Sequence, residues 1–295
     1  MKKGIVVRAF SKSSDFLGDS SFLSSLEDYR KVFAKAADHG FESVQIYTEI
    51  SEGFLCLETP ESTLKEIANI AKDCGIQIPS LEIAPLQYSF TSDDPEERER
   101  GKKVVAKALY MARLLGAKGV LVIPGYVGLP WEKGGGDPVD YEQAYLRTRD
   151  ALKHLAPVAE ETEVSIYLEN IWNLFLLSPL EMRGLIDEVG NDRVGVLLDT
   201  GNVIQYGFPE QWIRILGHRI QEVHLKDFRR SVGTVDGFVP LLAGDVNWPK
   251  VMDALREIQF EGYLIPEVFP YDSYGDTMLA HVSATVDRLL EGEVA

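Results

Sequence analysis

Residues 194–199, Val-Gly-Val-Leu-Leu-Asp, form a short apolar run that ends on a single carboxylate. A run of this length is typical of a strand buried on both faces of a parallel sheet. A stretch with helical periodicity, residues 179–189, precedes it and stops at Gly190, which can supply the left-handed residue that ends a helix. The segment therefore predicts one helix, one turn and one buried strand of a fold in which helices and parallel strands alternate.

The same pattern recurs along the whole chain. Seven further apolar runs are predicted as strands: residues 4–8, 43–47, 76–83, 119–123, 164–169, 220–225 and 263–268. Helical periodicity fills the spaces between and after them, in residues 26–39, 60–74, 95–115, 141–161, 210–216, 248–258 and 276–290. Asp94-Pro95 and Ser178-Pro179 place a capping residue and a first-turn proline at two helix starts. Eight such units predict a single (β/α)8 TIM barrel over residues 1–295, with a doubly wound sheet as the alternative.

Charge and cysteine content exclude several classes of function. The chain has 46 acidic and 30 basic residues and a net charge of −16, which disfavours binding to nucleic acid or to an anionic membrane. Two cysteines, Cys56 and Cys74, provide no CxxC pair for zinc or redox chemistry. The first apolar run is interrupted at Arg8, and the sequence lacks about 18 consecutive apolar residues, so neither a signal peptide nor a membrane span is expected. We expect a cytoplasmic protein.

Four polar residues coincide with the ends of successive predicted strands: Glu169, Asp199, His224 and Glu267. In a TIM barrel the carboxyl ends of the strands form the active site, so these side chains are expected to converge. Three buried carboxylates would repel one another unless a cation neutralised them. Three oxygens and one imidazole suit Mn²⁺, Mg²⁺, Co²⁺ or Zn²⁺, and the residues alone leave the choice of ion open.

These residues lie in motifs that carry a family likeness. The motifs are Leu168-Glu169-Asn170, Leu198-Asp199-Thr200-Gly201-Asn202, Val223-His224-Leu225-Lys226-Asp227, and Gly244-Asp245-Val246-Asn247-Trp248 leading to Pro266-Glu267. With them the chain resembles the xylose isomerase-like superfamily of sugar isomerases and epimerases, which includes ketose 3-epimerases. The resemblance implies that Glu169, Asp199, His224 and Glu267 bind one divalent metal ion, with manganese expected first. It also implies that Glu169 and Glu267 transfer protons on the two faces of an enediolate.

The same likeness suggests which residues contact the substrate. Arg230 matches an arginine that steadies the substrate in the family, and a shift of one residue would give that role to Arg229. Further contacts are expected from Asn202, Lys226, Glu82 and Trp172, with Glu49 and Asn173 as additional candidates. Lys226 and Asp227 could instead form a salt-bridged pair that shapes the strand end.

Two departures from the free-ketose epimerases leave the substrate open. Those enzymes often have a histidine where this chain has Asn202 and a second glutamate where it has Phe175. The Asp-Thr-Gly-Asn form looks more like the sugar-phosphate 3-epimerases. A phosphate would need donors near Lys226, Arg229 and Arg230.

The favoured function is therefore a metal-dependent ketose or ketose-phosphate 3-epimerase, with aldose-ketose isomerisation as its nearest variant. An inosose-type dehydratase is the alternative, because it begins with the same proton abstraction. A DNA-repair endonuclease with three zinc ions is disfavoured, since only one of five histidines lies at a strand end. Retention of both glutamates argues against a barrel that only binds ligands. The expected partners are a small sugar or sugar phosphate and further copies of the chain, as a dimer or tetramer.

One long loop stands out between the predicted units. Residues 124–138 contain Gly134-Gly135-Gly136 and are long for a connection between a strand and a helix. The loop is interpreted either as a lid over the substrate or as an insertion that contacts another subunit. Its aromatic residues Tyr126 and Trp131 are expected to be exposed, which is the basis for expecting an oligomer.

Overall fold

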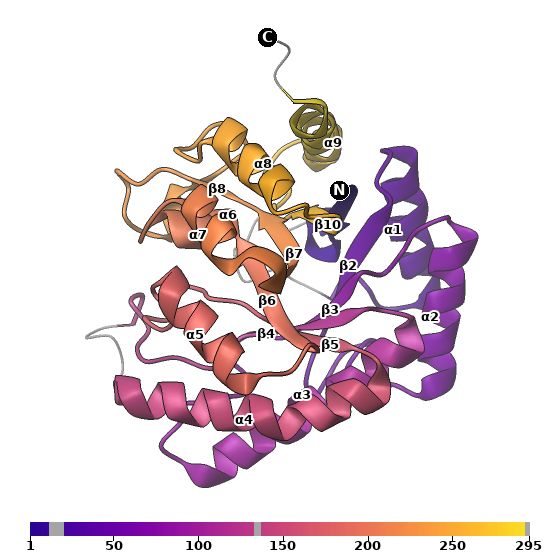
Figure 1. The fold of residues 1–295 in the computed structure, drawn as a ribbon. Coiled ribbons are helices and arrows are strands. Elements are labelled where there is room, and N and C mark those ends of the chain that lie inside the picture. Colours follow the sequence, from indigo (N-terminus) through magenta and orange to yellow (C-terminus); the bar gives the residue numbers. More distant parts are fainter. Residues whose placement is uncertain (12–20, 133–136, 293–295) are drawn as a thin grey trace.

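A closed barrel of eight parallel strands forms the centre of the molecule (Figure 1). The computed structural model describes residues 1–11, 21–132 and 137–292. Around the barrel the strand order is β1-β10-β7-β6-β5-β4-β3-β2. The strands are β1 (Lys2–Val6), β2 (Ser43–Thr48), β3 (Ser80–Ile83), β4 (Gly119–Val122), β5 (Ser165–Leu168), β6 (Val194–Asp199), β7 (Ile220–Leu225) and β10 (Tyr263–Pro266). This confirms the predicted (β/α)8 TIM barrel.

Helices surround the barrel in sequence order (Figure 1). Each buries one face against the barrel. They are α1 (Leu26–Asp38), α2 (Glu61–Asp73), α3 (Pro95–Leu115), α4 (Tyr141–Thr162), α5 (Pro179–Val189), α7 (Pro209–Leu216), α8 (Trp248–Glu257) and α9 (Gly275–Glu291). Apolar side chains at helical spacing, such as Leu64, Ile67 and Ala71 of α2, are buried between helix and strand. The main hydrophobic core is therefore a layer between the barrel and the helices.

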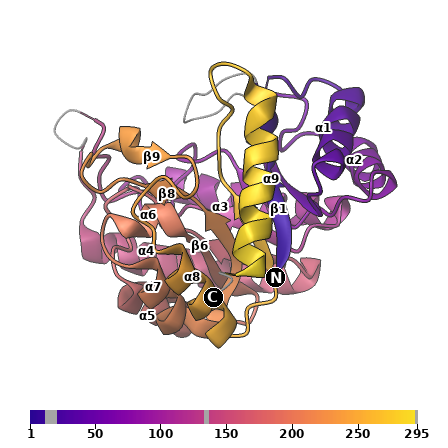
Figure 2. The same ribbon diagram turned by 90° about the horizontal axis from the view of Figure 1, so that it is seen from above.

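The predicted helix ends agree with the local chemistry. Asp94 and Ser178 accept hydrogen bonds from the backbone N–H groups of Glu96 and Leu180, at the starts of α3 and α5. Gly190 after α5 has a φ of 66°, as a left-handed helix end requires. The first and last elements, β1 and α9, lie side by side (Figure 2), and Lys3 Nζ joins them by a 2.6 Å ion pair with Asp287.

One strand starts later than the sequence pattern predicts. Residues 76–83 were expected to be extended throughout, but β3 begins at Ser80. Pro79 has no backbone N–H to donate, so it interrupts the ladder and delays the strand, although its carbonyl accepts from Lys118 N at 2.9 Å. Ile76 and Ile78 are nevertheless buried, so the apolar pattern reflects packing of the chain that leads into the strand.

Two further elements, not predicted from the sequence, lie at the barrel end that carries the site. The short helix α6 (Thr200–Ile204) begins directly after β6. An antiparallel ribbon of β8 (Asp227–Phe228) and β9 (Phe238–Val239) follows β7 and lies beside α6 (Figure 2). Segments of two residues have no measurable periodicity, so the sequence pattern could not reveal this ribbon.

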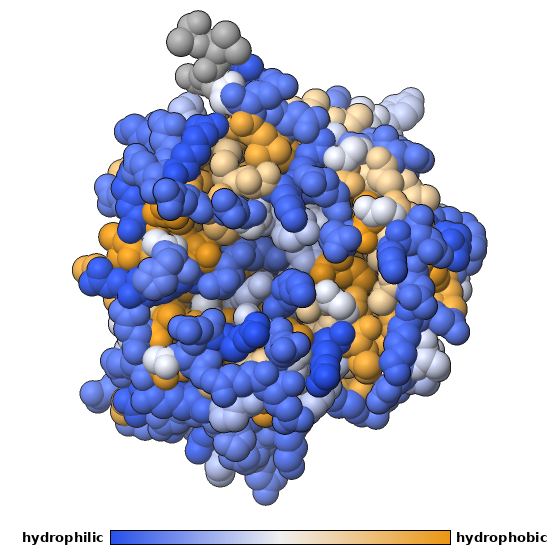
Figure 3. Space-filling view, turned by 45° about the vertical axis from the view of Figure 1, so that its right-hand side comes forward, coloured by the Kyte–Doolittle hydropathy of each residue, from blue (hydrophilic) through white to orange (hydrophobic). Residues whose placement is uncertain are grey.

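The outer surface is mostly polar. Figure 3 shows one face on which hydrophilic side chains predominate and apolar patches are interspersed. Among the described residues, every helix is too short or too polar to cross a membrane.

Candidate metal centre

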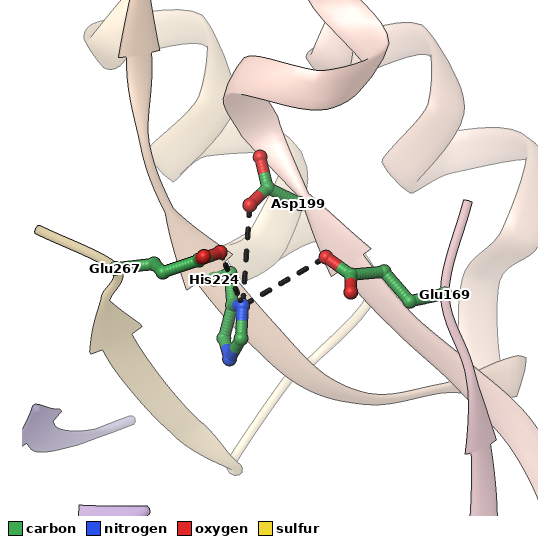
Figure 4. Close-up of side chains that lie close together, drawn as sticks. All are labelled: Glu169, Asp199, His224 and Glu267. Carbon is green, nitrogen blue, oxygen red and sulfur yellow. Dashed lines mark hydrogen bonds and ion pairs between the residues drawn. The ribbon is translucent and has the colours of Figure 1, made fainter. Parts of the chain in front are cut away.

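Four side chains from neighbouring strands meet at the carboxyl end of the barrel (Figure 4). His224 lies on β7, Asp199 ends β6, and Glu169 and Glu267 directly follow β5 and β10. The Nδ1 atom of His224 lies 3.1 Å from Glu267 Oε2, 3.8 Å from Glu169 Oε1 and 3.9 Å from Asp199 Oδ2. One possible ligand atom from each residue lies within 4.8 Å of those of the other three. The structure thus brings the four predicted ligands together.

Strand register places these groups at one level. Asp199 is paired with His224 across β6 and β7. Glu169 and Glu267 continue the ladder by one residue, because their backbone N–H groups donate to Val122 O and Leu225 O, each at 3.1 Å. In parallel strands the side chains at one level of the barrel point to a common centre. The fold therefore determines the convergence that the sequence could only suggest.

Asp199 has two oxygens with different tasks. Oδ1 accepts hydrogen bonds from the backbone N–H groups of Gly201 and Asn202, at 2.7 and 2.8 Å, and so caps helix α6. Oδ2 is buried, lies 3.1 Å from Lys226 Nζ, and forms no hydrogen bond within the described part of the chain. The cap fixes the carboxylate so that its second oxygen faces His224.

Two cationic side chains reach the same space. Lys226 Nζ lies 2.6 Å from Glu267 Oε2, and Arg8 Nη2 lies 2.7 Å from Glu82 Oε1 and 3.5 Å from Glu267 Oε1. Glu169 accepts a hydrogen bond from the side-chain amide of Asn202 at 3.2 Å. The cationic side chains therefore lie closer to Glu267 than to Glu169.

These surroundings shift the pKa values in different directions. Burial raises the pKa of Glu169 well above its ordinary value, and burial also raises that of Asp199. Burial acts the same way on Glu267, but Lys226, His224 and Arg8 outweigh it and hold the pKa of that carboxyl well below its usual range. Burial disfavours the charged imidazole of His224, yet the hydrogen bond to Glu267 and the nearby carboxylates raise its pKa to about 9.

The donor set fits a divalent cation. Three carboxylate oxygens and one imidazole nitrogen are ligands that Mn²⁺, Mg²⁺, Co²⁺ and Zn²⁺ accept. Ligands about 2.1 Å from a shared ion lie at most about 4.2 Å from one another, close to the observed spread of the four atoms. The buried Asp199 Oδ2, which lacks a hydrogen bond within the described part of the chain, supplies the acceptor such an ion would satisfy.

A cavity of about 290 Å³ lies next to the four residues. Four predicted substrate contacts line it together with Glu169 and Glu267, namely Asn202, Lys226, Glu82 and Trp172. The remaining wall is largely apolar and comes from Pro85, Leu86, Ile123, Trp131, Ile171, Val235 and Phe238. Glu82 is 4% exposed and paired with Arg8, so it faces the cavity as part of an ion pair.

Arg230, the predicted substrate arginine, does not line this cavity. Its guanidinium stacks over the ring of Phe208 at 4.7 Å and donates to Gly207 O. Arg229 also points elsewhere, because its Nε donates to Ala243 O at 3.0 Å. Both arginines follow the β8 strand and are exposed, which places them outside the barrel mouth.

Lys226 does not pair with Asp227, the alternative that the sequence left open, because its ammonium group lies against Asp199 and Glu267. Side chains of consecutive extended residues point in opposite directions, so Lys226 faces the carboxylates while Asp227 faces away. Asp227 instead accepts hydrogen bonds from Gly244 N at 3.0 Å, Val246 N at 3.2 Å and Trp248 Nε1 at 3.1 Å. It ties residues 244–248 to the β8–β9 ribbon.

Three further sequence-based expectations need correction. Asn173 is buried and donates to Gly125 O at 2.6 Å, so it supports a loop and does not line the cavity. Glu49 lines a separate hollow next to Tyr47. Tyr126 is half-buried, whereas Trp131 is 49% exposed and lines the site cavity. Gly134-Gly135-Gly136 lie outside the described residues.

Arg8 is a site residue that the sequence reasoning missed. It is 5% exposed, lines the cavity and stacks over the ring of Tyr47 at 5.3 Å. The signal was present, because Arg8 ends the first apolar run just as Asp199 ends another. By itself, however, an arginine at that position indicates only that the hydrophobic segment is interrupted.

Comparison with known proteins identifies the family of the chain. The family described as xylose isomerase-like TIM barrel matches residues 33–285. A D-psicose 3-epimerase of Enterocloster bolteae is 24% identical over 272 residues, which cover 89% of this chain and 83% of that protein. An inosose dehydratase of Bacillus cereus is 29% identical over 217 residues, covering 65% and 71% of the two chains.

A solved structure of an L-ribulose 3-epimerase superimposes with a TM-score of 0.77 at 20% identity, over 98% of this chain and 94% of that one. At this identity the superposition shows the fold. The family match covers most of the chain and includes the predicted ligands Glu169, Asp199, His224 and Glu267. The chain belongs to the xylose isomerase-like TIM barrel family, and its relatives include a D-psicose 3-epimerase and an inosose dehydratase.

Proposed function

We propose that the protein is a divalent-metal-dependent ketose or ketose-phosphate 3-epimerase. One observation carries the proposal: Glu169 and Glu267 approach His224 from opposite sides and line one cavity (Figure 4). Inversion at a carbon needs one group to remove a proton from one face and another to return a proton to the opposite face. Two carboxylates from strands on either side of the centre meet this need.

The proposed mechanism assigns separate tasks to the residues. Glu169, Asp199, His224 and Glu267 would hold the ion, which supplies charge stabilisation for an enediolate next to a carbonyl. Glu169 and Glu267 exchange protons with the substrate carbon. Lys226 and Arg8 keep negative charge on Glu267 favourable, since they lie 2.6 and 3.5 Å from its oxygens. Trp172, Asn202 and Glu82 are proposed to position the sugar.

An inosose-type dehydratase is the second candidate. The inosose dehydratase of Bacillus cereus is 29% identical to this chain over the matched region. A dehydratase begins with the same proton abstraction but then expels a hydroxyl group. The two reactions need the same metal centre, so the products must distinguish them.

Proton NMR in D₂O tests the proposal. The protein is loaded with Mn²⁺, incubated with free ketoses, their phosphates and an inosose, and the metal is chelated before spectra are recorded. We expect deuterium at C3 together with the new epimer. Deuterium at C1 would indicate an isomerase, and loss of water would indicate the dehydratase. If no sugar exchanges and Asp199→Ala binds Mn²⁺ like the unmodified protein, the proposed site is wrong.

We further propose manganese as the ion, a cytoplasmic location, and assembly into a dimer or tetramer. The half-exposed Trp131 at the cavity supports an assembly in which a second copy covers this face. Light scattering coupled to size-exclusion chromatography measures the assembly. A monomeric mass would refute it.

A further inference from the structure

The inside of the barrel is divided into an apolar and a polar half. Leu121, Tyr167 and Leu197, on β4, β5 and β6, form an apolar cluster. On β2, β3 and β7 the chain instead buries Gln45, Ser80 and Glu222, which are exposed by 1%, 0% and 2%. None of these three lines the substrate cavity. A buried carboxylate in a barrel interior is costly, so its hydrogen bonds need an explanation.

The polar half is a directional hydrogen-bond network. Glu222 Oε1 accepts from Ser80 Oγ at 2.5 Å and from Gln45 Nε2 at 2.9 Å. Gln45 Nε2 also donates to Ser80 Oγ at 2.8 Å. Both hydrogens of the Gln45 amide are then engaged with oxygen acceptors. Turning the amide round would place its carbonyl oxygen against the Glu222 carboxylate, which is unfavourable.

The orientation of Gln45 determines the state of His224. With its nitrogen toward Glu222, the amide presents Oε1 to His224 Nε2 at 3.0 Å. A carbonyl oxygen only accepts, so Nε2 must carry a hydrogen. When the ring is neutral, as a metal ligand must be, the lone pair then lies on Nδ1, and the proton that Nδ1 shares with Glu267 Oε2 at 3.1 Å in the charged ring has left. Nδ1 is the atom that faces Glu169, Asp199 and Glu267.

We propose that Gln45, oriented by Glu222 and Ser80, is a positioning residue that holds His224 in the Nε2–H tautomer with Nδ1 directed at the metal. Glu222 lies two residues before His224 on β7, so both side chains face the barrel interior, one layer apart. The network therefore reaches the metal centre from inside the barrel, away from the substrate. This inference rests on the proposed metal site.

The first test removes the acceptor with Gln45→Leu. Mn²⁺ affinity is measured by calorimetry with MnCl₂ added to the metal-free protein. The tautomer is read from ¹⁵N NMR of the metal-free protein in a pH series, at the alkaline plateau where the His224 signals no longer move and the ring is neutral. Only five histidines contribute signals, and His224→Gln identifies the relevant pair. We expect Mn²⁺ binding to weaken by about 10- to 100-fold and the Nδ1–H tautomer to appear.

A second variant, Glu222→Met, keeps the side-chain size and removes a buried charge, so we expect it to fold. The Gln45 amide can then turn over. We expect a mixture of the Nε2–H and Nδ1–H tautomers of His224, and weaker Mn²⁺ binding. Ser43→Ala is the matched control. Ser43 lies on the same face of β2 as Gln45, is fully buried, and its hydroxyl makes no hydrogen bond among the described residues. Its loss is expected to leave both readouts unchanged.

The outcomes separate the two proposals. An Nδ1–H tautomer in the unmodified protein overturns the inference, whichever variants fold. The inference is also overturned if Glu222→Met or Gln45→Leu keeps both the Mn²⁺ affinity and the His224 tautomer of the unmodified protein. If the unmodified protein binds no Mn²⁺, the proposed function loses its metal centre. The tautomer measurement on the metal-free protein then still decides the role of Gln45.

Discussion

Glu169 and Glu267 have the same chemistry but different surroundings. Glu267 has Lys226, His224 and Arg8 within 3.5 Å, whereas Glu169 has the amide of Asn202 at 3.2 Å and two carboxylates nearby. Charge-assisted pairing favours the ionised form of Glu267, and burial favours the protonated form of Glu169. The two glutamates thus favour unlike protonation states, which the proposed acid and base pair requires.

Glu267→Gln is expected to retain Mn²⁺ binding and to lower kcat by about 10²- to 10⁴-fold, because the amide keeps a ligand oxygen but cannot transfer the proton. Calorimetry and deuterium incorporation measure the two effects. Glu210→Gln is the control, since Glu210 is buried on α7 and lies outside the cavity. Unchanged turnover in Glu267→Gln would remove this residue from the mechanism.

The two candidate arginines should respond differently to substitution. Arg8→Met leaves the buried carboxylate of Glu82 without its cationic partner, while Glu267 keeps Lys226. The change is expected to cost about 3–5 kcal/mol of unfolding free energy and to reduce kcat/KM. Arg230→Met removes an exposed stack on Phe208 and is expected to cost less than about 1 kcal/mol. Urea denaturation and steady-state kinetics provide the comparison. Equal effects would contradict the placement of both side chains.

The ribbon of β8 and β9 depends on one side chain at its base. Asp227 accepts hydrogen bonds from four groups, three of which belong to residues 244–248. This fixes the return of the chain after the ribbon and so the positions of Val235 and Phe238, which line the cavity. Asp227 does not line the cavity itself, but through the ribbon it helps to determine the shape of the cavity.

Asp227→Asn is expected to destabilise the protein by about 1–3 kcal/mol, because its amide group faces backbone donors that need an acceptor. We also expect a raised KM and faster proteolysis within residues 229–246, with Mn²⁺ binding retained. Asp236→Asn, an exposed change on the same ribbon, is the control and should stay within about 0.5 kcal/mol. Loss of Mn²⁺ binding with an unchanged KM would refute this role.

At the scale of the molecule, a net charge of −16 coexists with a site that gathers three carboxylates, of which Glu169 and Asp199 are buried and Glu267 is partly exposed. In the metal-free protein these charges are balanced in part by a protonated His224, whose pKa is about 9. A metal ion needs the neutral ring, so it competes with the proton. Binding of the ion and stability of the metal-free fold should therefore depend on pH in opposite directions.

The expected pH dependence can be measured directly. His224 has a folded-state pKa above its unfolded value, so its stabilisation is complete below about pH 6.5 and is lost as the pH rises through about 9, a change of about 3 kcal/mol. Between pH 6 and 8, where the ring loses its proton only to the ion, Mn²⁺ affinity should rise about tenfold per pH unit. Urea denaturation with EDTA and calorimetry test the two trends. An affinity independent of pH would contradict them.

The sequence predicted most of the architecture and four of the residues at its centre. Helix ends such as those at Asp94, Ser178 and Gly190 are determined by residues close in the chain. The same is true of the buried strands that lead to Asp199 and Glu267, so these elements can be predicted from local sequence. The ribbon at Asp227 escaped, because it depends on hydrogen bonds to residues that lie about twenty positions later. Propensity and period do not describe such contacts.

The sequence by itself determined that helices and buried strands alternate eight times and that polar residues end several of the strands. Tertiary structure decided which of those residues meet. It turned Arg8 toward Glu267, placed Arg230 on Phe208, and aligned Gln45 with His224 across 179 positions. The physical reason is that direction and distance between side chains on different strands follow from barrel closure and register, which no local segment encodes.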